Sequence, residues 1–408
     1  MKKPQALLAA SLLAPAIALA FETVDTLPWP SSGRFIAYPA EAARPTDLWV
    51  QAGIMHDDNV LRLEDGGQSE QILRFGAGVR HDQRVIGRQR VILSARADYY
   101  DFQDFQDLDH LAYSGLADWR WEVGNNLAGS VLVGRERRLA DLGETRSPER
   151  SMVTLTRLAA SGGYLVTPRL RLRAGVGRTL SERTERFDPE TEATSVTGAA
   201  EYVTPLGNSI GVEARNTDGD APVDEEVAGF IVNNDFTERE LALVAGYVLG
   251  ARLRTDARFG RTTRRYEELP GRDFEGSTWR ARVEWMPANK TLLELAFYKE
   301  PRSIIDISAS HAVVKGIAFG PSWAATSKLV FSARVLREDR EFEGDPGIIV
   351  AGATPRDETT DGWRLGVGWE PVRHWQVAFA LDGGKRSSNL GGRDYDYTAL
   401  SANVAWRY

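Results

Sequence analysis

Histidine is the side chain that most often transfers protons near neutral pH, so the histidines are the first candidates for catalysis. The chain has five of them: His56, His81, His110, His311 and His374. A hydrolase would need one of them beside a serine and a carboxylate or amide. No Gly-x-Ser-x-Gly turn accompanies any of the five, and the chain has no cysteine that could act as a thiolate. The sequence therefore predicts no catalytic residue and no enzyme.

Two acidic segments could bind a cation. The first consists of His56, Asp57, Asp58 and Asn59. Neighbouring side chains of a strand point to opposite faces, so only Asp57 and Asn59 share a side, which is too few ligands for calcium. The segment 216–220 begins with calcium-loop spacing, but the twelfth position from its start is the apolar Val227. We therefore expect no bound metal and no cofactor.

Arginine is the residue type with the clearest binding potential. Arginines recur on the polar side of segments in which apolar and polar residues alternate, and we predict that they line a pore: Arg74, Arg80, Arg96, Arg120, Arg171, Arg173, Arg254, Arg258, Arg280, Arg282, Arg334, Arg364 and Arg407. We find fewer acids on the same side: Asp98, Asp118, Glu201, Glu213, Asp256, Glu284 and Glu294. Guanidinium groups bind carboxylates and phosphates in a bidentate fashion, so an arginine-rich wall favours anions. The alternative is that each arginine pairs with an acid across neighbouring strands.

The alternation itself indicates the elements that carry these arginines. In the segment 363–370, Trp363, Leu365 and Val367 point one way, and Arg364 and the glycines point the other way. A period of two residues is typical of a strand with two unlike faces. Mean hydropathy is −0.33, and no segment after the first twenty residues approaches the ~20 apolar residues of a membrane helix. The chain is predicted to be all-β.

The turns between these strands fall into two alternating classes. The tight turns contain Gly, Pro or Asn and are expected at Ile86-Gly87, Gly124–Asn126, Thr167-Pro168, Pro205–Asn208, Gly250, Pro287–Asn289, Pro321-Ser322 and Glu370-Pro371. Longer polar connections lie between them, for example 61–70, 139–149, 216–234 and 338–359. Short turns on one side and long loops on the other are typical of a transmembrane antiparallel up-and-down β-barrel, here of about 18 strands. A propeller is the alternative, but the blocks share no repeat signature.

Aromatic residues support the barrel. They precede the short turns at a similar distance, as expected for a girdle at a membrane–water interface: Trp121, Tyr164, Tyr202, Tyr247, Trp285, Trp369 and Tyr408. A last strand that ends in an aromatic residue resembles the signal by which barrel assembly machinery recognises outer-membrane proteins.

The amino terminus indicates export. Residues 1–20 have two lysines, a short apolar run and an Ala-Leu-Ala cleavage site, so they are predicted to be a cleaved signal peptide. Residues 21–44 are expected to be a periplasmic segment or a plug of the pore, and residues 45–408 the barrel domain. This organisation predicts the outer membrane of a Gram-negative bacterium, with its lipid bilayer and the assembly machinery as partners.

The segment His56-Asp57-Asp58-Asn59-Val60-Leu61-Arg62-Leu63, placed after an opening strand, resembles the signature of the EpsL-type outer-membrane β-barrels. That family is associated with exopolysaccharide biosynthesis clusters, so the resemblance implies passage of a polysaccharide, with periplasmic polysaccharide-export proteins as partners. The strand number and the arginine-rich interior are also similar to those of the alginate export porins.

These features lead us to expect a porin-like channel for export of an exopolysaccharide, anionic or neutral, through an arginine-rich lumen. A general or anion-selective diffusion porin for small solutes is the main alternative, and it would carry one long loop folded inward. An outer-membrane hydrolase is a remote alternative. Nothing in the mild net charge of −7 suggests a nucleic-acid partner.

Overall fold

The computed structural model describes residues 45–408 except 146, 185–190, 221–224, 228–229, 234, 251, 269, 307–308 and 344–354. The expected signal peptide (1–20) and amino-terminal segment (21–44) lie outside the described residues. None of the described helices is both long and apolar enough to cross a membrane.

Eighteen antiparallel strands form one sheet, as the sequence predicted. The first half contains β1 (Thr46–Asp57), β2 (Glu70–Arg84), β3 (Arg90–Phe102), β4 (His110–Val123), β5 (Leu127–Leu139), β6 (Met152–Thr167), β7 (Leu170–Arg183), β8 (Thr191–Val203) and β9 (Ser209–Asp220). The second half contains β12 (Phe236–Leu249), β13 (Leu253–Tyr266), β14 (Phe274–Ala288), β15 (Thr291–Asp306), β16 (Ala309–Ala324), β17 (Leu329–Glu343), β18 (Asp357–Trp369), β19 (Trp375–Ser388) and β20 (Tyr395–Arg407).

The connections contain little regular structure. Between β9 and β12, a separate two-stranded sheet pairs β10 (Glu225–Val227) with β11 (Phe230–Val232). Two short 3-10 helices, η1 (Gln106–Leu108) and η2 (Pro270–Arg272), and one short α-helix, α3 (Leu142–Thr145), lie in other connections.

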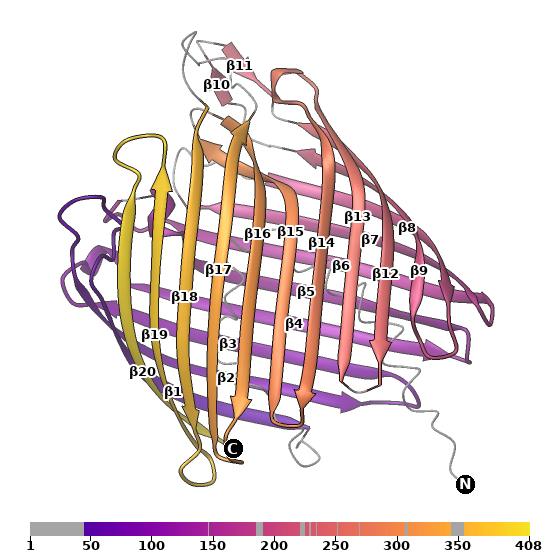
Figure 1. Cartoon of the computed structure of the whole chain (residues 1–408), viewed down its shortest axis with the longest axis horizontal. Helices are drawn as coiled ribbons and strands as arrows, with labels where there is room; N and C mark the ends of the chain where they lie inside the picture. The colour runs from indigo at the N-terminus through magenta and orange to yellow at the C-terminus, as the bar shows by residue number, and fades with distance from the viewer. Residues whose placement is uncertain are drawn as a thin grey trace.

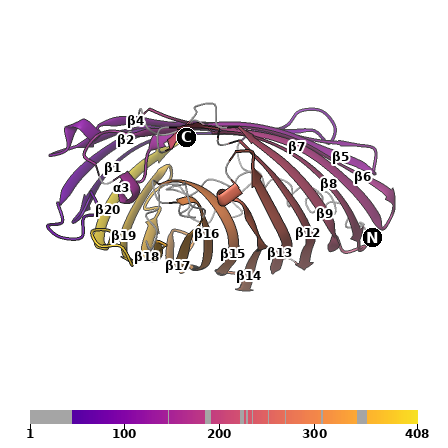
Figure 2. The same cartoon turned by 90° about the horizontal axis from the view of Figure 1, so that it is seen from above.

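The sheet closes on itself. Each of the eighteen strands pairs with its neighbours in the barrel, and β20 pairs with β1, where Leu48 and Tyr408 exchange two backbone hydrogen bonds of 3.2 and 2.8 Å. In Figure 1 the strands β1–β9 cross behind β12–β20, as the tilt of strands in a barrel requires. Figure 2, seen from above, shows the two halves as facing walls. Closure leaves no free strand edge.

The two faces of the barrel wall differ in polarity. Apolar side chains on the outer face are exposed, such as Val196 (59%), Leu241 (61%) and Phe259 (59%). Charged residues at the alternate positions of the same strands point inward and are buried, such as Glu201 and Glu240. Since side chains alternate along a strand, one pattern creates both the apolar exterior and the polar lumen.

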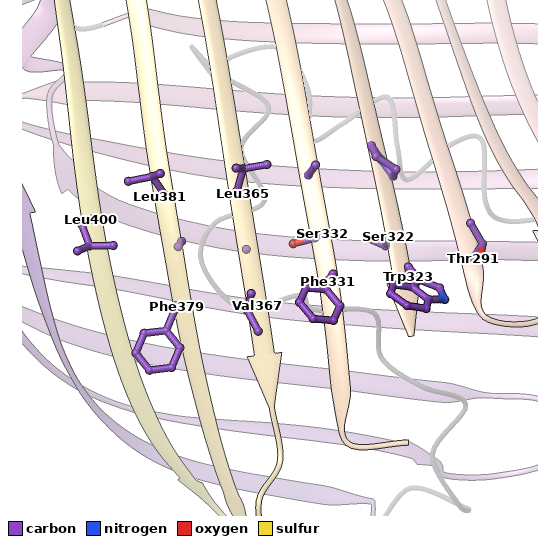
Figure 3. Close-up of a pocket in the computed structure, with 14 residues that line it drawn as sticks. Thr291, Ser322, Trp323, Phe331, Ser332, Leu365, Val367, Phe379, Leu381 and Leu400 are labelled. Atoms are coloured by element: carbon purple, nitrogen blue, oxygen red, sulfur yellow. The ribbon is translucent and has the colours of Figure 1, made fainter. Parts of the chain in front are cut away.

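An apolar depression lies on the outer face over β15–β20. Trp323, Phe331, Leu365, Phe379 and Leu400 are among its lining residues (Figure 3). The depression belongs to the apolar exterior and is separate from the charged lumen.

The predicted turns agree with the structure except at Pro287–Asn289, where β14 continues to Ala288 and the chain turns at 289–290, and at Pro321-Ser322. These two residues lie inside β16, and the chain reverses at 325–328 instead. Pro321 lies opposite Leu293 of β15, while the register with β17 skips it between Phe319 and Ser322. A proline lacks the N–H that a strand donates, so it marked an interruption of pairing rather than a turn.

The outer connections also differ from expectation. The connections predicted at 216–234 and 338–359 are shorter, because β9 continues to Asp220, β17 to Glu343 and β18 begins at Asp357. Polar residues in these segments belong to strands whose two faces are both polar.

Candidate functional site in the barrel lumen

All thirteen predicted arginines occupy positions whose side chains point inward. Several of them alternate with exposed apolar residues; for example, Arg364 lies between Trp363 and Leu365, which are 36% and 51% exposed. Register places Arg334 directly opposite Arg364, and Arg254 opposite Glu284. Their placement agrees with the expected orientation, and their role in lining a pore stays a prediction.

A chain of ion pairs crosses β7, β8, β9, β12 and β13; we call it the β7–β13 ladder. Its members in order are Arg171, Glu201, Arg173, Glu213, Arg258, Glu240, Arg215, Glu238 and Arg264. Arg173 Nη2 lies 2.6 Å from Glu201 and 3.1 Å from Glu213, and so joins two acids. Here the arginines are paired across strands, the alternative considered for the whole set.

Other predicted arginines have acidic partners outside this ladder. Arg74 and Arg96 share Asp98, at 3.0 and 2.5 Å, and Arg120 pairs with Asp118 at 2.7 Å. The remaining pairs are Arg80–Asp82, Arg280–Glu300, Arg282 with Glu284 and Glu294, and Arg364–Asp382.

The set of seven acids predicted on the same side as the arginines was therefore incomplete. The structure adds inward carboxylates that the sequence reading did not assign to the lumen: Asp82, Glu144, Glu238, Glu240, Glu300, Glu338 and Glu358. Glu238 and Glu240 could have been found, because they continue the alternation set by the outward Leu241 and Leu243.

Three of the predicted arginines differ from the rest. Among the described residues, no carboxylate oxygen lies within 4.0 Å of the guanidinium of Arg254, Arg334 or Arg407. All three side chains are partly exposed. Arg334 also lies opposite Arg364, and like charges in that position repel. These arginines are the strongest candidates for contact with an anion in the lumen.

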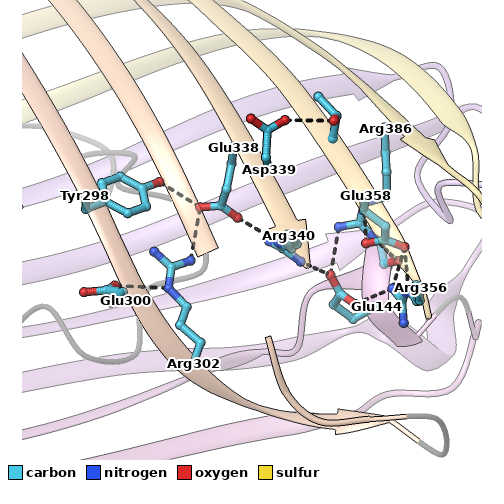
Figure 4. A network of polar contacts seen from close by, with 12 residues as sticks. Glu144, Tyr298, Glu300, Arg302, Glu338, Asp339, Arg340, Arg356, Glu358 and Arg386 are labelled. Carbon is cyan, nitrogen blue, oxygen red and sulfur yellow. Dashed lines mark hydrogen bonds and ion pairs between the residues drawn. The ribbon is translucent and has the colours of Figure 1, made fainter. Parts of the chain in front are cut away.

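The β5–β6 connection, residues 140–151, folds inward and reaches the other side of the barrel. Its helix α3 carries Glu144, whose Oε1 accepts hydrogen bonds from Arg340 of β17 at 2.7 Å and Arg386 of β19 at 2.8 Å. Arg386 Nη1 also donates to the carbonyl of Gly143 at 3.0 Å. Figure 4 shows Glu144 between these arginines and Arg356. These contacts connect Gly143 and Glu144 to β17 and β19 through the interior of the barrel.

The connections that follow β1, β3 and β5 pack together at one end of the barrel. A buried apolar cluster contains Val60, Leu61, Ile72, Phe102 and Leu108, and partly buried Leu139 and Leu142 pack against it. Within the β5–β6 connection, the Gly143 amide donates to the Asp141 carboxylate at 2.8 Å and the Glu144 amide donates to the Asp141 carbonyl at 2.9 Å. The apolar contacts and these two hydrogen bonds hold Glu144 in its inward position.

A second chain of ion pairs, the β14–β19 ladder, includes Glu144. Its members are Arg280, Glu300, Arg302, Glu338, Arg340, Glu144, Arg386, Arg356 and Glu358. Figure 4 labels all of them except Arg280. Tyr298 Oη donates to Glu338 at 2.7 Å. The Tyr298 ring crosses Gly316 of the intervening β16, where a Cβ would lie 2.2 Å from a ring atom, so any larger residue would push this hydroxyl away from Glu338.

Electrostatics keep Glu144 ionised. Burial raises the pKa of its carboxyl, but the nearby Arg386, Arg340 and Arg356 outweigh burial and lower the pKa from 4.5 to about 2. The carboxylate is therefore a permanent charge near neutral pH.

The segment His56–Asn59 anchors the first outer loop. Asp57 and Asn59 are buried, and His56 and Asp58 are exposed, as alternation predicts. Asp57 pairs with Arg62 at 2.8 Å, and the Arg62 guanidinium lies 3.6 Å from the centre of the Tyr397 ring. The Asn59 side chain donates to the carbonyls of Leu63 and Asp396 at 2.9 Å. In this structure the segment closes the loop against β20.

The predicted aromatic girdle residues point outward next to the short turns. Tyr164, Tyr202, Tyr247, Trp285, Trp369 and Tyr408 are 46–59% exposed, and Trp121 is partly exposed. Trp323, Trp375 and Trp406 lie on the same face near the same end. Within the described part of the chain, no group of three or more His, Asp or Glu residues is arranged to hold a metal ion.

No known family model matches the sequence, and no curated protein matches it. Solved structures similar to it include OpdK from Pseudomonas aeruginosa, with 10% identity, 89% of this chain and 99% of that chain covered, and a TM-score of 0.47. Another is P. aeruginosa OccK2 (OpdF) in complex with glucuronate, with 14% identity, coverage of 89% and 98%, and a TM-score of 0.47. A third is a BenF-like porin from Pseudomonas fluorescens Pf-5, with 10% identity, coverage of 89% and 98%, and a TM-score of 0.47. Identities and TM-scores this low do not assign the chain to a family.

Proposed function

We propose that the protein is a non-catalytic channel for small acidic solutes in the outer membrane of a Gram-negative bacterium. The observation that carries this proposal is the inward β5–β6 connection, whose Glu144 binds Arg340 and Arg386 on the far wall. A closed barrel with an apolar exterior suits a bilayer, because closure satisfies every strand edge. The proposal includes export through a cleaved signal peptide (1–20) and insertion by barrel assembly machinery.

The inward connection supports a small solute. A loop that projects into the lumen narrows an aqueous channel that an 18-stranded barrel would otherwise leave wide. A polymer would have to pass beside this loop or displace it. A small solute needs neither.

The uncompensated arginines support an acidic solute. Arg254, Arg334 and Arg407 offer guanidinium groups on the lumen wall that no described carboxylate neutralises. Rings of arginine or lysine favour anions in pores, and the planar guanidinium matches a carboxylate.

Export of an exopolysaccharide is a second candidate. It is supported by the likeness of His56, Asp57, Asp58 and Asn59 to the EpsL-type signature, together with the arginine-rich wall. On this alternative a polysaccharide and periplasmic export proteins would be the partners, and the inward connection would have to move.

The test is conductance of the refolded mature protein in a planar bilayer, with the reversal potential measured in a salt gradient. We expect an anion-selective channel, and vesicles that contain the protein should take up glucuronate faster than glucose. A cation-selective channel, or none, would contradict the proposal. Block by an acidic polysaccharide added on one side, together with no uptake of glucuronate, would favour the export function.

A further inference from the structure

Three buried arginines meet at one point of the lumen wall; we call them the arginine triad. The side chains of Arg340, Arg356 and Arg386 are 7%, 2% and 1% exposed. The wall supplies two fully buried carboxylates to this group, Glu338 and Glu358. The third carboxylate is Glu144, which comes from the β5–β6 connection and not from the wall.

Arg386 depends on that connection. Within the described residues both of its hydrogen bonds end on the connection, at the Gly143 carbonyl and the Glu144 carboxylate. Its Nε has no hydrogen-bond partner there, and Glu358 Oε2 lies 3.8 Å away. If the connection moved away, a buried guanidinium would lose its partners, which is costly unless another anion replaces them.

Glu144 is the carboxylate that can be replaced. Its side chain is 32% exposed, whereas those of Glu338 and Glu358 are 0% exposed. Its contacts to the triad are one carboxylate oxygen shared by Arg340 and Arg386, and the other oxygen 3.8 Å from Arg356. A carboxylate that arrives from the lumen would have the same charge and could take the same donors.

We infer that the arginine triad is a binding site for the carboxylate of a small acidic solute, and that Glu144 is an internal ligand which the solute displaces. Displacement frees the β5–β6 connection from the far wall and widens the lumen. The exchange replaces one carboxylate by another, so the charge of the site does not change. The inference rests on the proposed function only for the route by which the solute reaches the triad.

An internal ligand lowers the apparent affinity for an external one, because only the fraction of molecules with a vacant site can bind. Removal of the Glu144 charge should therefore strengthen solute binding. Calorimetric titration of the refolded full-length mature protein with glucuronate, and with glucose as the neutral probe, measures this effect. We expect Glu144→Gln to bind glucuronate about tenfold more tightly than the natural protein, or more.

Glu149→Gln is the matched control, since Glu149 lies in the same connection, is exposed, and makes no contact with the triad among the described residues. It removes the same charge and should leave glucuronate affinity unchanged. Equal affinities for the natural protein and Glu144→Gln would overturn the inference. So would an equal gain in Glu149→Gln, which would indicate a general charge effect.

A distance measurement tests displacement without a change at Glu144. Because the chain has no cysteine, Glu149→Cys and Ser387→Cys place one spin label on the connection and one on β19, both at exposed positions. Glucuronate should lengthen the distance between the two spin labels or broaden its distribution, and glucose should not. An unchanged distribution at saturating glucuronate would refute displacement. A change in distance in a protein that conducts no ions would keep the internal-ligand inference and reject the proposed channel.

Discussion

At the scale of single residues, the neighbours of each arginine decide what it can do. Arg171 is 3% exposed, and both of its hydrogen bonds to Glu201 lie inside the β7–β13 ladder. Arg334 lies at a similar position on another strand, but it has no described acidic partner and faces Arg364. We therefore expect arginines of the ladders to stabilise the wall, and arginines such as Arg334 to attract anions.

Arg334→Gln should lower the preference of the channel for chloride over potassium, because it removes a positive charge that no carboxylate neutralises. The stability of the barrel should change little. The measurement is the reversal potential in a tenfold salt gradient, compared with urea unfolding in lipid vesicles.

Arg171→Gln should have the reverse effects. It removes the two hydrogen bonds that Arg171 donates to Oε2 of the buried Glu201 and leaves that carboxylate with Arg173 alone. We expect this to lower the free energy of unfolding by about 3 kcal/mol, the lower end for a broken buried ion pair. Its reversal potential should match that of the natural protein. If both variants shift selectivity equally, ion pairing does not determine which arginines attract anions.

The Glu144 carboxyl should stay ionised in mildly acidic solution. Its pKa in the folded protein, about 2, is below the ordinary value of 4.5, so its ion pairs contribute fully above pH 4.5 and are lost only as the pH falls through about 2. Single-channel conductance should therefore be the same at pH 7 and pH 4. An abrupt increase in conductance between pH 6 and pH 4 would show that another group holds the connection.

At the scale of elements, alternation along each strand separates the apolar side chains that face outward from the polar side chains that face the lumen. On β6 the outward Leu158 is 50% exposed and its neighbour Ala159 faces the lumen opposite Gly177. The inward connection between β5 and β6 is also divided by polarity. Its Leu142 packs against the apolar cluster, and its Glu144 carboxylate accepts a hydrogen bond from Arg340 in the lumen.

This separation predicts unequal effects of one substitution at adjacent positions. Leu158→Arg should lower the free energy of unfolding in vesicles by about 2–4 kcal/mol, because the charge would face lipid. Ala159→Arg, one residue further along β6, should cost much less because the guanidinium enters a polar lumen. Urea titration followed by tryptophan fluorescence measures both, and similar losses would contradict the assigned faces.

At the scale of the whole molecule, stability depends on closure between the ends of the barrel. β1 and β20 pair over Trp49–Asp57 and Ala399–Arg407, so the last strand completes a sheet that begins some 350 residues earlier. Loops from the first part of the chain then reach the wall built by its last part, as Glu144 and Arg386 show.

Deletion of residues 395–408 should therefore prevent closure, because it leaves unpaired edges on β1 and β19. We expect loss of the compact form that resists detergent on unheated gels. Deletion of residues 225–232, which include the separate pair β10 and β11, should retain that form. A compact, resistant product from the first deletion would mean that β20 is not needed to close the barrel.

Local patterns in the amino-acid sequence were enough to predict the strands and the two faces of each strand. The alternation at 363–370, the glycines and prolines of the short turns and the aromatic residues beside them are local signals, because side-chain direction and turn geometry depend on a few neighbouring residues. They were sufficient to predict about eighteen strands. Pro321 shows the limit, because the same residue type that marks a turn can also interrupt a strand.

Which charged side chains form ion pairs depends on the tertiary structure. Arg386 and Glu144 are 242 residues apart, and their contact depends on the register of many strands and on a loop packed against Leu108 and Val60. The same long-range placement gives Arg171 an acid and leaves Arg334 opposite another arginine. Periodicity fixes the face on which a side chain lies, whereas its partner is fixed by strands that are distant in the chain, and the chemistry of the lumen depends on those partners.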